Sequence, residues 1–76
     1  MYSLSYFNRS HIDLRATETF ERGDFIESYF EIEDVEIALY SLYTFYVEVH
    51  TKVLESSMIF DIKGISVNDA LDRYSS

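Results

Sequence analysis

Carboxylates are the residues with the most evident chemistry in this sequence, and most of them lie in one stretch. Eight acids and a single base, Arg22, fall between Glu18 and Glu36, so this stretch carries −7 of the total net charge of −8. Acids two apart on a strand point to the same side, roughly 7 Å from each other. Three interpretations are open: a solvated face that keeps the protein soluble, an oxygen-ligand site for calcium or magnesium, and a surface for a basic partner.

The arrangement of these acids favours a partner surface over a metal site. The spaced Asp, Asn and Gly pattern of a calcium loop is absent. Double-stranded DNA presents one charge per roughly 1.7 Å of axis, and an acidic strand with interleaved aromatic rings would reproduce part of such a line. We therefore expect the stretch to occupy a basic, nucleic-acid-binding groove of another protein. The candidate partner-binding residues are Glu21, Asp24, Phe25, Glu27, Tyr29, Glu31, Glu33, Asp34 and Glu36.

Other residue types offer no pattern that supports catalysis. His11 and His50 stand 39 residues apart, and neither has a second ligand beside it at a metal spacing. Two glycines cannot build a phosphate-binding loop, and no serine stands in a nucleophile-elbow pattern. The sequence predicts a protein that is not an enzyme and that has no catalytic residues, metal site or cofactor. The acidic stretch also disfavours direct nucleic-acid binding.

Composition indicates one small domain over residues 1–76. The chain has no proline and no cysteine, and 47% of its residues are hydrophobic. A core this small is marginal on its own, and without disulfides the stabilising elements would be aromatic packing and a partner subunit. Absent cysteines fit a reducing compartment, and we find no signal peptide and no apolar stretch of the roughly 20 residues that span a bilayer. We predict a cytoplasmic protein that forms a homodimer.

The elements that position the acids begin with a predicted hairpin over residues 11–33. Apolar and polar residues alternate on both sides of Arg22-Gly23-Asp24, as in two half-buried strands. A three-residue loop at this tripeptide pairs Ala16 with Phe30 and keeps apolar side chains together. This register buries Phe30, and Phe30→Ala should then cost about 3–5 kcal/mol.

Residues 34–54 fit two descriptions. Apolar residues recur at helical spacing, and Asp34 is a suitable N-cap, whereas "YTFYVEVHTKV" is rich in the β-branched and aromatic residues of strands. The helix accounts for more positions, so we expect a long helix here. Its partly exposed side would form a dimer interface, with the residues Ile37, Tyr40, Tyr43 and Val47.

The remaining pattern predicts a strand over 57–63 and a short C-terminal helix over 66–74, which Ser66 would cap. Residues 1–7 are a further candidate edge strand. The expected fold is an α+β domain in which a small antiparallel sheet has its helices packed on one face.

Size and charge together suggest a non-enzymatic inhibitor or adaptor. Very small acidic proteins without chemistry of their own are common among inhibitors encoded by viruses and mobile elements, including DNA mimics and anti-CRISPR proteins. That is an association by size and charge alone. The alternative is a homodimeric regulatory domain that acts through the aromatic side of helix 34–54, with the acids only solvating.

Overall fold

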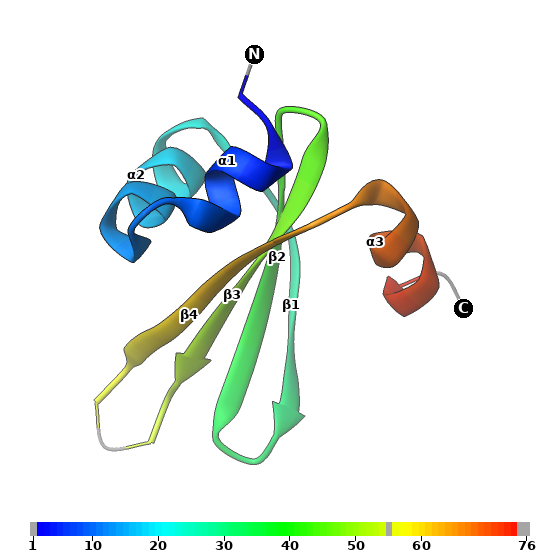
Figure 1. The fold of residues 1–76 in the computed structure, drawn as a ribbon. Helices are drawn as coiled ribbons and strands as arrows, with labels where there is room; N and C mark the ends of the chain where they lie inside the picture. Colours follow the sequence, from blue (N-terminus) through cyan, green and yellow to red (C-terminus); the bar gives the residue numbers. More distant parts are fainter. Residues whose placement is uncertain (1, 55, 75–76) are drawn as a thin grey trace.

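The computed structural model describes residues 2–54 and 56–74 and shows a four-stranded antiparallel sheet with three short helices (Figure 1). In chain order the elements are α1 (Leu4–Arg9), α2 (Ile12–Arg22), β1 (Asp24–Ile32), β2 (Val35–Leu42), β3 (Phe45–Lys52), β4 (Met58–Ile65) and α3 (Val67–Tyr74). The strands lie side by side in sequence order, so β1 and β4 are the two edges of the sheet. The α+β class with an antiparallel sheet is therefore confirmed.

Residues 12–22 form a helix, so the hairpin expected over residues 11–33 is wrong. Ile12, Ala16 and Thr19 lie at helical spacing and turn toward the sheet, whereas alternation would have required Leu14 and Phe20 to be buried as well. Leu14 and Phe20 are 39% and 47% exposed. The N-cap is His11, whose ring accepts a hydrogen bond from the Asp13 amide.

The Arg22-Gly23-Asp24 tripeptide joins α2 to β1 instead of closing a hairpin. Gly23 is the C-cap, and its N–H donates to the Thr19 carbonyl at 2.9 Å. A side chain at this position would collide with the backbone, because a Cβ would stand 2.6 Å from the Thr19 oxygen. The close approach requires the glycine, and the backbone angle does not, because a φ of −82° is open to any residue.

The helix expected over residues 34–54 is also wrong, because this segment is the β2–β3 hairpin. Leu42 pairs with Phe45 across a two-residue turn in which Tyr43 has a φ of 54°. Glycine or asparagine usually occupies such a position. Here the Tyr43 ring stacks on Tyr2 with centroids 5.0 Å apart, and its hydroxyl donates to Glu18 at 2.8 Å. These contacts, from Tyr2 before α1 and from Glu18 of α2, hold a turn that has no local sequence signal.

The predictions were right for the C-terminal part of the chain and wrong for its N-terminal part. The strand predicted over 57–63 and the helix predicted over 66–74 agree with β4 and α3. The candidate edge strand over residues 1–7 is wrong, since residues 4–9 form α1, while Met1 lies outside the described residues.

Helices cover both faces of the sheet, which corrects the expected packing on one face (Figure 1). On the face of α1 and α2, Phe7 packs in a cluster with residues that include Val47 and Val49. On the other face, Ala70 of α3 packs with Leu39 and Ile65. Successive side chains of β3 alternate between the two faces, so the central strands are buried on both sides.

The β4 edge is protected by side chains from the N-terminal helices. The Asn8 amide binds both backbone groups of Gly64, accepting from its N–H at 2.8 Å and donating to its carbonyl at 3.0 Å. Arg15 donates to the Ile62 carbonyl at 2.6 Å. Residues two apart on a strand turn their backbone groups to the same edge. Asn8 and Arg15 thus occupy two successive positions where another strand would pair.

Candidate functional site

The β1 edge has no comparable side-chain protection, and two register shifts, between Phe25 and Glu27 and between Phe30 and Ile32, interrupt its pairing with β2. All nine of its residues are exposed, and within residues 2–54 and 56–74 no side chain hydrogen-bonds to its backbone. Five of the nine are large apolar or aromatic residues, namely Phe25, Ile26, Tyr29, Phe30 and Ile32. An open edge with this much exposed apolar surface is a template for pairing or docking.

The predicted acids follow this edge from end to end. Asp24, Glu27 and Glu31 are exposed on β1, and Glu33 is exposed in the β1–β2 turn. At about 3.3 Å per residue, the nine residues of β1 extend over roughly 30 Å. One acid of this turn is partly compensated, because the Asp34 carboxylate lies 3.9 Å from the Lys52 ammonium of β3. The structure thus arranges much of the acidic stretch along one open strand.

Two predicted acids lie away from the edge. Glu21 is exposed in the last turn of α2, just before β1 begins. Glu36 is half-buried on β2, opposite Phe30. Phe30 itself is 61% exposed and does not face Ala16, so the core position expected for it is wrong.

The two predicted aromatic residues lie on opposite faces of β1. Phe25 contacts Tyr40 edge to face, with centroids 5.6 Å apart, on the side of α2. Tyr29 lies on the side of α3, where its ring and hydroxyl meet those of Tyr74 at 5.8 and 3.0 Å. Both rings are exposed yet held by a neighbour, which lowers the entropy that a partner would have to remove on binding.

The four residues expected at a dimer interface do not form one exposed surface. Ile37 and Val47 are only 1% and 0% exposed, because their side chains lie on the covered faces of the sheet. Tyr40 is half-buried between Phe20 and Phe25. Tyr43 alone is well exposed, and its hydroxyl already binds Glu18.

A buried carboxylate that the sequence analysis did not single out anchors α3 to the sheet. Glu48 of β3 is 2% exposed and accepts hydrogen bonds from Arg73 at 3.0 Å and from the Tyr74 hydroxyl at 2.5 Å. The His50 ring lies 3.1 Å away. Because the Tyr74 proton points to Glu48, the Tyr29 hydroxyl must donate to the Tyr74 oxygen. This chain of hydrogen bonds links the edge strand to the centre of the sheet.

Electrostatics in this network favour the ionised carboxylate. Burial pushes the pKa of Glu48 upward, but the hydrogen bonds from Tyr74, Arg73 and His50 outweigh it and lower the pKa overall. Burial and the bond to Glu48 raise the pKa of Tyr74, which therefore stays a donor. One signal in the sequence was available, since Glu48 stands between Val47 and Val49 in an alternating apolar segment.

The remaining observations limit what the site can do. The described part of the chain holds no group of three or more His, Asp or Glu residues placed to bind a metal ion. None of its helices has the length and apolar character needed to cross a membrane. No protein-family model, curated protein or solved structure matches the chain at a significant level. The function must therefore be inferred from the geometry of the β1 edge.

Proposed function

We propose that this protein is a non-enzymatic inhibitor or adaptor whose acidic β1 edge occupies a basic, nucleic-acid-binding surface of a partner protein. The observation that supports it is the contrast between the edges: on β4 Arg15 and Asn8 bind backbone groups of Ile62 and Gly64, whereas no described side chain binds the backbone of β1. Natural proteins usually protect an edge strand, because an open one invites association. An edge whose backbone groups no described side chain binds fits a surface that associates as its function.

The side chains of β1 indicate the chemistry of the partner. Three exposed acids on the strand and Glu33 at its end would repel an acidic surface and attract a basic one. The interleaved Phe25 and Tyr29 supply aromatic area of the kind that dominates binding energy in interfaces. A groove that normally holds nucleic acid offers both lysine and arginine charges and surfaces on which rings stack.

Affinity capture from a lysate of the source cells tests this proposal. The wild type should retain a DNA- or RNA-binding protein, and added double-stranded DNA or RNA should displace it. A variant with Glu27, Glu31 and Glu33 all changed to Gln should lose the partner. Salt should weaken capture, because charge contacts are screened over about 10 Å at 0.1 M.

A charge-matched variant provides the control. Asp13, Asp69 and Asp72 are exposed acids outside the edge, and changing all three to Asn removes the same three charges. Retention of the partner by this control would show that position matters. If both variants lost the partner equally, only the total charge of the protein would matter for capture, and the proposal would be overturned.

A second candidate is a homodimer formed by two β1 strands, as in a dimeric regulatory domain. An antiparallel pairing centred on Ser28 would set Glu27 opposite Tyr29 and Glu31 opposite Phe25, so no acid of β1 would face another acid. Light scattering across micromolar concentrations checks it. A mass of twice 9.0 kDa supports the dimer, and a constant 9.0 kDa rules it out.

A further inference from the structure

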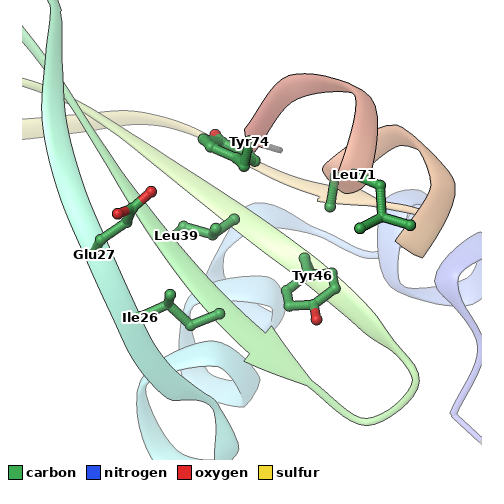
Figure 2. Close-up of a pocket in the computed structure, with 7 residues that line it drawn as sticks. Ile26, Glu27, Leu39, Tyr46, Leu71 and Tyr74 are labelled. Atoms are coloured by element: carbon green, nitrogen blue, oxygen red, sulfur yellow. The ribbon is translucent and has the colours of Figure 1, made fainter. Parts of the chain in front are cut away.

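A hollow beside the β1 edge has the chemistry to hold one side chain of the partner. It lies between β1 and α3, has a volume of about 270 Å³ and is open to solvent. Ile26 and Glu27 line it from β1, Leu39 and Tyr46 from the sheet, and Leu71 and Tyr74 from α3 (Figure 2). Pockets for cofactors and drug-sized ligands usually measure about 300–1,000 Å³. This hollow is smaller and suits a single side chain.

The charge of the hollow selects the kind of side chain. Glu27 is the only charged residue in its lining, and its carboxylate has no hydrogen-bond or ion-pair partner among the residues that the structure describes. Figure 2 shows this carboxylate pointing toward the space between β1 and α3. The base of the hollow is apolar, because it is formed by the buried side chain of Leu39, which is 4% exposed. An occupant must therefore combine an apolar stem with a positive end.

The aromatic walls distinguish the two basic side chains. Tyr46 and Tyr74 flank the space from different elements, and a planar guanidinium stacks on such rings while pairing with a carboxylate through two hydrogen bonds. The Tyr74 wall is fixed in advance, because its hydroxyl is held by Glu48 and Tyr29. A lysine ammonium has no planar group to stack on the rings and no pair of parallel N–H donors to bind both carboxylate oxygens.

We propose that this hollow binds an arginine side chain of the partner, with Glu27 pairing with the guanidinium and Leu39 supporting the stem. The inference rests on the function proposed above and specifies the contact at its centre. It predicts that Glu27 contributes more to binding than other acids of the same strand, although all of them contribute equally to the net charge.

Fluorescence anisotropy with two labelled heptapeptides tests the inference. One peptide alternates glycine with arginine and the other alternates glycine with lysine. We expect the wild type to bind the arginine peptide several-fold more tightly. Glu27→Gln should weaken that binding by about tenfold and abolish the preference, whereas the matched Glu31→Gln should weaken it by only about twofold. Unchanged melting temperatures would show that both variants fold.

The other outcomes separate this inference from the proposed function. Salt-sensitive binding that falls equally in the two variants, or that does not distinguish arginine from lysine, would overturn the arginine hollow and leave the acidic edge intact. Failure of the wild type to bind either peptide would overturn both.

Discussion

The two edges of the sheet differ in whether side chains from other elements bind their backbone groups. At β4, Asn8 and Arg15 bind the backbone groups of Gly64 and the carbonyl of Ile62, and Gly64 lets α1 approach so closely that a Cβ there would stand 2.6 Å from Leu4. At β1 nothing comparable is present in the described residues, and every side chain is exposed. The comparison shows that the N-terminal helices stabilise one edge and leave the other available.

The largest expected difference comes from the same substitution on each edge strand. Ile62 of β4 is 1% exposed, and Ile32 of β1 is 61% exposed. Ile62→Ala should cost about 3 kcal/mol of unfolding free energy, because it leaves a cavity beneath α1 and α2. Ile32→Ala should cost less than about 0.5 kcal/mol. Urea denaturation measures both values, and similar losses at the two positions would contradict the comparison.

Removing the protection of β4 should have a smaller effect. Asn8→Ala leaves the N–H and the carbonyl of Gly64 without their partner in a partly buried place, which should cost about 1–2 kcal/mol. Asn8→Asp keeps the acceptor for the N–H but sets a carboxylate oxygen against the Gly64 carbonyl, so it should cost at least as much. The measurement is again urea denaturation. If Asn8→Ala were neutral, the amide would not be what protects this edge.

The Glu48 network should stabilise α3 and so define one wall of the hollow beside β1. Glu48→Gln removes the charge that Arg73 and Tyr74 bind, and we expect a loss of about 1–2 kcal/mol at pH 7. The figure is modest because Arg73 is 44% exposed and solvent screens its charge.

The pH dependence of this loss follows from the lowered pKa of Glu48. A carboxyl group with a pKa lower in the folded than in the unfolded chain contributes stability above its ordinary value of 4.5, and that stability disappears as the pH falls through the folded-state pKa. The difference between wild type and Glu48→Gln should therefore shrink below about pH 4.5. Melting curves at pH 7 and pH 3 check this, and a constant difference would show that the charge of Glu48 is unimportant.

The smallest expected effect concerns the acids of β1. Changing Glu27, Glu31 and Glu33 to Gln should alter the unfolding free energy by no more than about 0.5 kcal/mol, because Glu27 and Glu31 are exposed on the edge strand and Glu33 in the adjoining turn. Thermal melting measures this. A large loss would assign these acids to stability and weaken their assignment to binding.

Several parts of the fold were accessible from the sequence because their signals are local. Ser66 caps α3, since its hydroxyl oxygen accepts a hydrogen bond from the Asp69 N–H, as the spacing of the two residues indicated. The apolar alternation of β4 and its position before that helix were also readable. The acidic stretch needed only a count of charges, and the structure places three of its eight acids on β1 and two in the adjoining turn.

The errors arose where tertiary contacts override local preference. The pattern of residues 12–22 satisfies both the helical and the strand period, and burial of Thr19 with exposure of Leu14 decides for the helix. The turn at Tyr43 lacks glycine and is held by Tyr2 and Glu18, which are distant in sequence. Because the sequence gives no sign of that turn, the apolar pattern of the two strands around it resembled that of one amphipathic helix.

Photo-crosslinking from the two edges tests the central claim most directly. Phe30 on β1 and Phe60 on β4 are 61% and 48% exposed, so each can be replaced singly by p-benzoylphenylalanine with little effect on folding. In source-cell lysate, irradiation should join the β1 variant to a nucleic-acid-binding protein, and the β4 variant should give no such product. Crosslinking of that partner from position 60 alone, or from position 30 only to a second copy of the chain, would contradict the assignment of the open β1 edge to a basic partner.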